Sequence, residues 1–597
     1  MREVIRETSI GQITRLVFGR KDLFPYPEEL PSFQLPASLS TGGPTVLLDR
    51  KLDDELKKQD AFTSCVEPSA FSTGTVTPFD EKDLEAGTSQ IWESSLPSPA
   101  VVGNATPKGG VASVQTIPVS TTPVREPVIV DWYGATDPAN PLNWPFRKRV
   151  FITTQMGLYT FAVYIGSSLY APAEADIMAS FGASYEVAAL GIALYVFGYG
   201  LGPLLWSPLS EMPAIGRSGI FIVTFFIFTM LALGASLVNS LSGLFVLRFL
   251  LGFFGSPCLA AAGATLDDMF VAWKLPYVLT VWSTSATFGP ALGPIMSGFA
   301  VTEKGWRWSG WELFWMAAPV WVLMFLTLPE TNPDTILHRR ANRLRARTGR
   351  SELISKEDLK RAQMSISQEI VYALIKPFQI NALDPAIFYT TCYASVLYAT
   401  YYSFFEAFPM VFSDMHGFNL GESGLPFLAF LPGLFIAVLG YIGWFRLMAE
   451  PVMRREPPPL YGFPEARLLP GVATTFLAPI GLFIFAWTSR PDIHWIVPII
   501  GLTILFISIF IAFQCMSFYI ARCYPKYSAS LFAANTFARS SFAAGSILFS
   551  KPMYEKLGVG GGVSLLGGLS IVCAVGMICL YLYGDRLRAR SRFAQSS

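Results

Sequence analysis

From residue 149 onward the chain repeats apolar runs of about 20 residues, separated by polar connections. A helix of about 20 residues crosses the roughly 30 Å hydrocarbon core of a bilayer. In lipid the backbone must satisfy its own hydrogen bonds, so each run is expected to be a helix. Twelve runs can be placed, at 149–172, 185–206, 218–238, 241–263, 276–300, 309–328, 385–410, 424–447, 469–489, 493–519, 528–549 and 561–583. The sequence therefore predicts an all-α membrane protein with 12 transmembrane helices.

The composition supports a membrane protein and argues against several other classes. Of the 597 residues 52% are hydrophobic and only 15% are charged, with a mean hydropathy of +0.43, which is too apolar for an ordinary soluble protein. The net charge of +1 gives no reason to expect a nucleic-acid partner. The seven cysteines show no CxxC or Cys/His spacing, so neither a metal site nor a disulfide framework is expected.

The runs divide the chain into five parts. Residues 1–146 are rich in Ser, Thr, Pro and Gly and are expected to form a long, mostly disordered tail. Within it, "REVIRETSIGQITRLVFG" has an amphipathic helical spacing, and "DWYGATDPANPLNWPFRKR" ends in a basic cluster. Six runs fall in 147–330 and six in 385–584, on either side of a polar segment at 331–384, and 585–597 ends the chain. This pattern predicts two six-helix bundles.

Positive charges are concentrated on alternate connections between the runs. One set carries the basic central segment, the terminal "RLRARSR" and further residues that include Arg147, Lys148, Arg149, Arg217 and Lys274. The opposite set carries only Lys304, Arg307, Arg490, Lys551 and Lys556. Because cytoplasmic loops are enriched in Lys and Arg, both termini and the central segment are expected in the cytoplasm.

Several kinds of chemistry lack the residues that they need. No GxxxxGK[ST] motif is present, which argues against an ATP-driven pump of the P-loop type. The three histidines fall in predicted loops, and no cluster of His or acidic residues marks an enzymatic site. Transport is the favoured class, and an enzyme is not expected.

Three ionisable residues stand clear of the predicted helix ends: Arg248, Glu406 and Arg539. A charge at a helix centre costs about 3 kcal/mol on insertion scales, so each should face the bundle interior. Alternatively, Arg248 snorkels to the interface, Glu406 reaches water at an outer helix end, and Arg539 is a structural pairing residue.

Three motifs resemble signatures of the major facilitator superfamily. "GPLLWSPLSEMPAIGR" resembles its loop signature through Glu211, Gly216 and Arg217, although Ser207 stands where glycine is usual. Such a loop turns tightly and lets an acidic and a basic group latch the two halves. "TFGPALGPIMSG" resembles the signature of proton-coupled exporters, and "RFLLG" resembles the fourth-helix signature, whose arginine is tied to proton transfer. The residues that match are Gly289, Pro290 and Gly293 in the former, and Arg248 and Gly252 in the latter.

Further stretches resemble the fungal drug:proton antiporters with twelve spans, most closely the Mdr/Flr type of multidrug exporter. They include "DPANPLNWP", "WRWSGWELFW", "YYSFFEAFPMVF", "PEARLLP" and "YSASLFAANTFARSSFAAG". The resemblance implies the major facilitator fold and alternating access in the plasma membrane. It also implies export of hydrophobic or cationic xenobiotics, such as azole and benzimidazole antifungals. The proton gradient would drive this export without a cofactor, and the expected partners are drugs, protons and membrane lipid around a monomer.

The aromatic run "FYTTCYASVLYATYYSFFEAF" is the best source of a permissive cavity wall. The expected cavity residues are Tyr398, Tyr402, Phe405, Phe408, Asn535 and Arg539, while Arg248 and Glu406 are the expected proton-coupling pair. The alternative for the aromatic residues is that they only pack between helices or form an interfacial belt. Two rival functions stay open: a facilitator for a metabolite such as a polyamine, amino acid or sugar, and a membrane sensor that transports nothing.

Overall fold

The structure is a computed structural model that describes residues 6–17, 25–31, 33, 127–361, 366–453, 464–524 and 528–591. Residues 35–125, the larger part of the predicted tail, lie outside the described residues.

The first half contains six expected spans, and all are helical. They are α5 (Phe146–Ser168), α7 (Tyr185–Glu211), α8 (Arg217–Leu237), α9 (Leu241–Gly255) continued by α10 (Pro257–Met269), α11 (Leu275–Lys304) and α12 (Trp308–Thr327). The fourth span is broken at Ser256 because Pro257 has no backbone N–H to continue the helix. Within this half α5 packs on α11, α7 on α9, and α8 on α12.

The second half contains the other six. They are α16 (Pro385–Phe408), η6 (Glu422–Ala429) with α17 (Phe430–Trp444), η9 (Pro464–Leu468) with α19 (Leu469–Thr474) and α20 (Leu477–Thr488), α21 (Ile496–Cys523), and the two parts of α22 (Ser528–Arg590). Gly558, with φ of 71°, separates the two parts of α22. Here α16 packs on α22, and α21 on α17 and α20.

The expected membrane fold is confirmed. Within the described residues, eight helices are long and apolar enough to cross a membrane, and α22 accounts for two spans. Helices α5, α11 and α16 have 23, 30 and 24 residues and are also long enough. These three carry more polar side chains, many of which are buried inside the protein, as Thr390 and Ser395 of α16 are.

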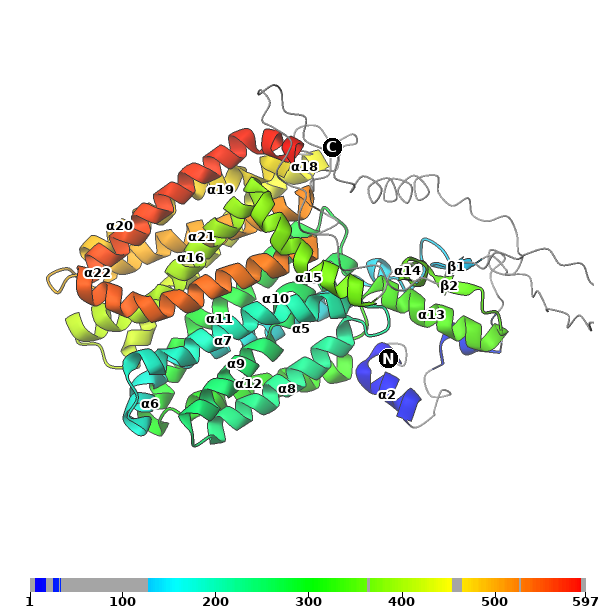
Figure 1. Cartoon of the computed structure of the whole chain (residues 1–597), viewed down its shortest axis with the longest axis horizontal. Coiled ribbons are helices and arrows are strands. Elements are labelled where there is room, and N and C mark those ends of the chain that lie inside the picture. The colour runs from blue at the N-terminus through cyan, green and yellow to red at the C-terminus, as the bar shows by residue number, and fades with distance from the viewer. Residues whose placement is uncertain are drawn as a thin grey trace, which may run out of the picture. The chain divides into compact units, whose positions relative to one another are not determined.

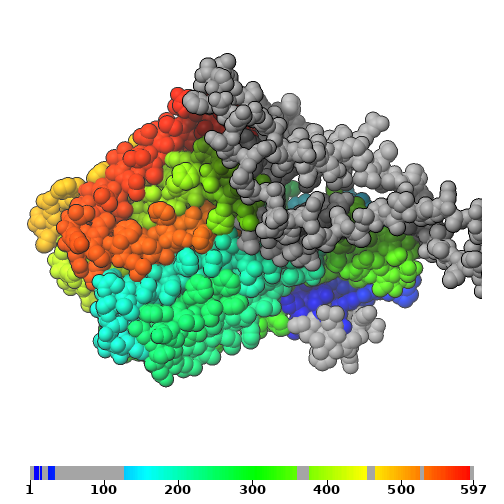
Figure 2. Space-filling view, viewed as in Figure 1, coloured from blue at the N-terminus to red at the C-terminus, as the bar shows by residue number. Residues whose placement is uncertain are grey.

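The bundle has two distinct ends, which Figure 1 shows at opposite sides of the view. We call the end that carries α13 (Pro333–Thr348) and α15 (Ile366–Leu383) the inner side. The end that carries α6 (Glu174–Phe181) and the π-helix η5 (Pro409–Met415) is the outer side. The two halves meet where α7 packs on α22 and where α11 packs on η6 and α17. In Figure 2 the cyan-to-green first half lies against the orange and red second half along this boundary.

Both ends of the predicted tail contain ordered residues, and they meet on α13. Glu28, in η2 (Pro27–Glu29), is buried and forms ion pairs with Arg340 at 3.2 Å and Arg343 at 3.4 Å. Asp137 reaches Arg340 at 2.7 Å from the segment just before α5. Tyr26 lies under Arg343, whose guanidinium carbon is 3.6 Å from the ring centroid. We call residues 6–17, 25–31 and 33 the N-terminal brace, because they tie α13 to the first bundle.

The brace also reaches the membrane helices. The helix α2 (Ser9–Val17) contacts α8 and α12, and Thr8 forms an isolated bridge with Pro329. A pair of short strands, β1 (Val128–Val130) and β2 (Leu353–Ser355), completes the inner side.

Candidate transport site

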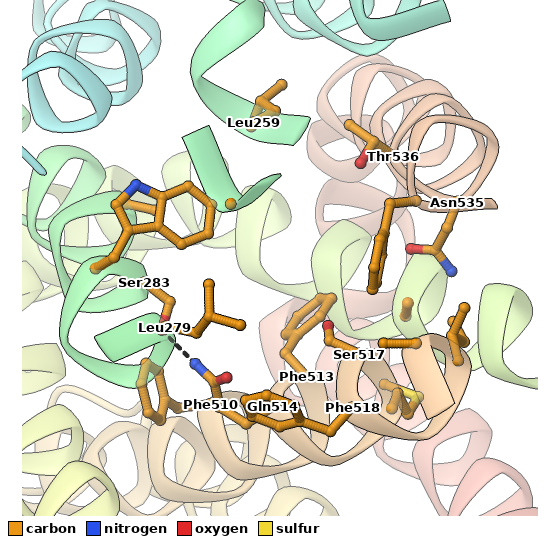
Figure 3. A pocket seen from close by; sticks show the side chains of 18 of the residues that line it. Leu259, Leu279, Ser283, Phe510, Phe513, Gln514, Ser517, Phe518, Asn535 and Thr536 are labelled. Carbon is orange, nitrogen blue, oxygen red and sulfur yellow. Dashed lines mark hydrogen bonds between the residues drawn. The ribbon is translucent and has the colours of Figure 1, made fainter. Parts of the chain in front are cut away.

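A cavity of about 670 Å³ lies between the two halves. Its walls come from α10 and α11 of the first half and from α16, α21 and α22 of the second. Figure 3 shows apolar and polar groups facing the space together, among them Leu259, Leu279, Phe510, Phe513, Ser517, Asn535 and Thr536. Gln514 donates a hydrogen bond to Ser283, which links α21 to α11 across the cavity wall (Figure 3). A volume in this range suits one drug-sized molecule.

The cavity extends from the middle of the bundle to the inner side. Its deepest charged residue is Arg539, near Tyr164 and Pro290, and at the other end it reaches Asp267 and Arg522, which are exposed. The structure therefore represents a conformation whose cavity faces the inner side.

Tyrosines close the cavity toward the outer side. The hydroxyl of Tyr402 on α16 lies 3.1 Å from that of Tyr199 on α7 and 3.1 Å from Ser167 Oγ on α5. Tyr199 is also hydrogen-bonded to Tyr398. These contacts join the two halves through groups that are buried.

Close backbone packing continues the closure further out. A Cβ on Gly424 of η6 would lie 2.7 Å from the carbonyl oxygen of Pro294, and one on Gly298 of α11 would lie 3.0 Å from that of Leu420. Such distances leave no room for a side chain, so α11 and the η6 segment touch directly.

Three of the expected cavity residues therefore lie outside the cavity, at its closed outer end. Tyr402, Phe405 and Phe408 do not line the described cavity in this conformation but are buried at its closed outer end. Phe405 and Phe408 pack on Phe427 of η6, with ring centroids 4.9 and 4.5 Å away. The reason is that the outer half of α16 is pressed against η6, so only its inner half reaches the open space.

The other expected cavity residues do line it: Tyr398, Asn535 and Arg539. Asn535 donates a hydrogen bond to Thr391 Oγ1 at 3.2 Å. The guanidinium carbon of Arg539 lies 5.1 Å from the ring centroid of Tyr398 and 5.5 Å from that of Phe513.

Arg248 faces the interior of the first bundle and does not snorkel. It is buried, and it donates hydrogen bonds to the carbonyl oxygens of Gly166 at 2.9 Å and Gly191 at 3.1 Å. The rings of Tyr170 and Tyr195 lie 4.6 and 4.7 Å from its guanidinium carbon. These contacts fix the cation in place without neutralising its charge.

Glu174, which the sequence reasoning missed, lies within electrostatic range of Arg248, Glu406 and Lys551. It begins α6, just outside the first span, and is buried with an Oε1 atom that has no hydrogen-bond partner in the described part of the chain. Burial, together with the neighbouring carboxylate of Glu406, raises the pKa of Glu174 well above its usual range. The only signal in the sequence was an acidic residue in "APAEADIM", immediately after an apolar run.

The loop between α7 and α8 adopts a tight turn at Gly216. Its φ is 80°, which favours glycine, and an added Cβ would collide with the carboxylate of Glu330. Glu330 accepts hydrogen bonds from the backbone N of Arg217 at 3.1 Å and from Ser218 Oγ at 2.9 Å. The Arg217 side chain forms an ion pair with Asp268 at the end of α10. Glu211 ends α7 and is exposed.

The motif glycines mark close helix crossings. A Cβ on Gly252 would meet the backbone of Tyr195 and Tyr199, which brings α9 against α7. A Cβ on Gly289 would lie 2.7 Å from Ile165 N, and one on Gly293 would lie 3.1 Å from Leu169 N, which brings α11 against α5. Pro290 lies between these two glycines and borders the cavity.

The pattern of the family described as Major Facilitator Superfamily matches residues 156–548. The chain belongs to this family. The match spans both halves and includes the three motifs discussed above.

Curated relatives in this superfamily extend over most of the chain. The MFS-type transporter pyvG of Aspergillus violaceofuscus is 43% identical over 80% of this chain and 88% of its own length. Fluconazole resistance protein 1 of Saccharomyces cerevisiae is 38% identical over 79% of this chain and 86% of its own. Multidrug transporter FLR2 of Candida glabrata is 37% identical over 79% and 80%. These matches confirm the expected likeness to fungal Mdr/Flr-type exporters.

Solved structures of major facilitator proteins share the fold. The xylose transporter XylE from E. coli in a partially occluded inward-open conformation has a TM-score of 0.52 at 12% identity, covering 72% of this chain and 98% of its own. The peptide transporter POT in complex with sulfate has a TM-score of 0.53 at 13% identity, covering 75% and 98%. At this identity the likeness concerns the fold alone.

Proposed function

We propose that this major facilitator protein is a multidrug efflux antiporter that exports hydrophobic xenobiotics, azole and benzimidazole antifungals among them. The observation that carries the proposal is the aromatic-walled cavity between the two halves, closed by tyrosines on one side and extending to the other. The names of two relatives, a multidrug transporter and a fluconazole resistance protein, support it.

The proposed setting is the plasma membrane, with both termini, α13 and the inner side in the cytoplasm. The charge distribution supports this orientation, since the basic central segment lies on the inner side. In that orientation the cavity is open to the cytoplasm and binds compounds from there. The protein acts as a monomer and uses the proton gradient without a cofactor.

Proton coupling is assigned to Arg248 together with the carboxyl groups of Glu174 and Glu406. An arginine stays charged, so it cannot be the titrating group. Its fixed cation instead makes it easier for a nearby carboxyl to release a proton. Glu174 belongs to the first half and Glu406 to the second, and two carboxylates that approach each other in a buried place repel unless one is protonated.

This arrangement gives a simple cycle. A proton bound to one carboxyl of the pair removes this repulsion and allows the halves to close on the outer side, as they do here. When the proton leaves toward the cytoplasm, repulsion between the carboxylates opposes the tyrosine contacts that hold the outer side closed, and it favours reopening outward, with the drug released there.

The test is efflux in a fungal strain that lacks its own drug pumps. Expression should raise resistance to fluconazole and benomyl and lower their accumulation, and a protonophore should restore accumulation. Unchanged accumulation of every drug, with normal abundance at the cell surface, would contradict the proposal. Proton-dependent uptake of a polyamine, amino acid or sugar would instead identify a metabolite facilitator, and no flux at all would favour a sensor.

A further inference from the structure

The charged groups that line the cavity are mostly positive. Among the described lining residues there are three arginines, Arg467, Arg522 and Arg539, and one acidic residue, Asp267. Asp267 lies at the exposed inner end, and it interacts electrostatically with Arg217 of the α7–α8 loop. The deep part of the cavity therefore has a positive potential.

Arg539 has no acidic partner in the part of the chain that the structure describes. Its Nε is buried without a hydrogen-bond partner, and its guanidinium lies near the rings of Tyr398 and Phe513. Rings stabilise a cation only partly, and a buried charge without a counter-ion is costly. An anionic group in the cavity would supply the missing partner, and the planar guanidinium is well suited to hold a carboxylate through two hydrogen bonds.

Polar groups around Arg539 can complete an anion site. Asn535 lies one helical turn before Arg539 on α22, so both side chains are on the same face, and both line the cavity. The tyrosines Tyr164 and Tyr398 also line the cavity and interact electrostatically with Arg539. Their hydroxyls and the amide of Asn535 supply hydrogen-bond donors.

The remaining wall of the cavity is aromatic and apolar, so it favours a ligand whose uncharged part is also apolar. Trp282 and Leu279 of α11 face Phe510 and Phe513 of α21, as Figure 3 shows for the labelled Leu279, Phe510 and Phe513. Such walls favour a flat ring system next to the charged group.

The inner end of the cavity would attract the same class of molecule. Arg467 and Arg522 both border it and interact electrostatically with each other, so two cations stand at the entrance. Clefts lined by one sign of charge raise the local concentration of ions of the opposite sign.

We propose that the cavity binds aromatic carboxylates, with Arg539 as the residue that holds the anionic group, so that amphipathic organic acids are substrates of this exporter. This inference rests on the proposed efflux function, and it extends the substrate range beyond neutral and cationic drugs.

The test is a binding comparison with three fluorescent probes that differ mainly in charge: anthracene-9-carboxylate, anthracene-9-carboxamide and 9-(aminomethyl)anthracene. The full-length protein is purified into nanodiscs, and Kd is measured at pH 7.5 by fluorescence titration. The carboxylate should bind about tenfold tighter than the amide or more, since hydrogen bonds to a charged acceptor are roughly twice as strong as those to a neutral one. The ammonium probe should bind most weakly. Equal affinity for the carboxylate and the amide, or preference for the ammonium, would overturn the proposal.

Substitutions of Arg539 test whether this residue causes the preference for the carboxylate probe. Arg539→Gln should abolish the advantage of the carboxylate, Arg539→Lys should retain part of it, and Arg490→Gln, which removes an exposed arginine from an outer loop, should retain all of it. If Arg539→Gln does not fold, the probe series on the unaltered protein and on Arg539→Lys still decides. A carboxylate advantage that survives in folded Arg539→Gln would contradict the assignment.

Binding and efflux can fail separately. Loss of fluconazole efflux with the carboxylate preference intact would refute the proposed function alone. Normal fluconazole efflux without the preference would refute this inference alone.

Discussion

The hydroxyl oxygens of Tyr199 and Tyr402 lie 3.1 Å apart and connect α7 of the first half to α16 of the second. Tyr402 makes a further contact with Ser167 Oγ, also at 3.1 Å. Since these groups lie between the open cavity and the closely packed outer contacts, they form the innermost layer of the closed gate. Any movement that opens the outer side must break them.

Tyr402→Phe should therefore shift the protein toward the outward-open conformation. The change removes two hydrogen bonds, each worth about 1 kcal/mol, and it keeps the ring in place. The equilibrium should move roughly five- to thirtyfold. Hydrogen–deuterium exchange of the amides in η6 and α6 would report the opening.

Tyr583→Phe is the matched control, because the Tyr583 side chain is exposed. It should leave exchange unchanged. Unaltered exchange in Tyr402→Phe would mean that the tyrosine contacts do not hold the gate.

Glu28→Ala should release the N-terminal brace from α13. The substitution removes the two ion pairs with Arg340 and Arg343 in a buried place, where such a loss costs about 3 kcal/mol. We expect faster amide exchange in α2 and α13 and reduced efflux at normal abundance. Glu303→Ala, at an exposed outer position, is the control. Deletion of 35–125, which lies outside the described residues, should reduce transport little.

Acidification should weaken a second contact on α13, the ion pair between Asp137 and Arg340. Burial opposes the ionisation of this carboxyl, but hydrogen bonds from Arg340 and from two backbone N–H groups outweigh it and hold the pKa of Asp137 below its usual value. A lowered pKa means that the stabilisation is fully present above about pH 4 and is lost as the pH falls further. The protection of the α13 amides, measured relative to the intrinsic exchange rate at each pH, should thus be constant between pH 8 and 5 and should fall only below that range. A loss of protection near neutral pH would show that another group controls docking.

Gly289→Ala should lower stability and transport together. Its Cβ would lie 2.7 Å from Ile165 N, so α11 and α5 must separate, at a cost of about 1–3 kcal/mol. The matched Gly440→Ala has nothing within 4 Å and should stabilise α17 by up to about 1 kcal/mol. Thermal melting in detergent should move in opposite directions for the two variants. An unchanged or raised melting temperature of Gly289→Ala would mean that the crossing at Gly289 tolerates a side chain.

Periodicity and charge were sufficient to predict the membrane helices, because lipid imposes length and apolarity on each span separately. They also predicted that Arg248 faces the interior of the bundle. Only the hydrogen bonds of Arg248 to the carbonyl oxygens of Gly166 and Gly191 exclude the alternative that its side chain extends to the membrane interface. Glu174 was missed because an acidic residue after an apolar run is typical of a loop, and only folding shows that α6 turns it inward.

The conformation and the brace were beyond the reach of sequence patterns for different reasons. A transporter alternates between conformations, so the sequence cannot say which part of α16 lines the cavity in one of them; Phe405 and Phe408 illustrate this. The brace depends on ion pairs such as Glu28 with Arg340, whose members are far apart in the chain. A local pattern shows at most that an amphipathic helix can form.

Glu174→Gln should uncouple transport from protons. The amide has nearly the same shape but cannot bind or release a proton, so proton uptake per exported drug should fall and efflux should lose its dependence on pH. A pH-sensitive dye inside proteoliposomes measures the proton flux. Asp176→Asn, on the same short helix α6, should behave as the unaltered protein does. Full proton coupling in Glu174→Gln would mean that Glu406, and not Glu174, binds and releases the coupled proton. Glu406→Gln would then be measured in the same way.

Drug flux in proteoliposomes under an imposed pH gradient tests the central claim most directly. The unaltered protein should move fluconazole against its concentration gradient when protons flow the opposite way, and the flux should stop when the pH gradient is collapsed. Arg248→Ala should abolish this uphill movement while the protein still binds drug, and Arg248→Lys should restore part of it because the charge survives. Uphill movement in Arg248→Ala equal to that of the unaltered protein, or flux that ignores the pH gradient, would contradict proton-coupled efflux through this site.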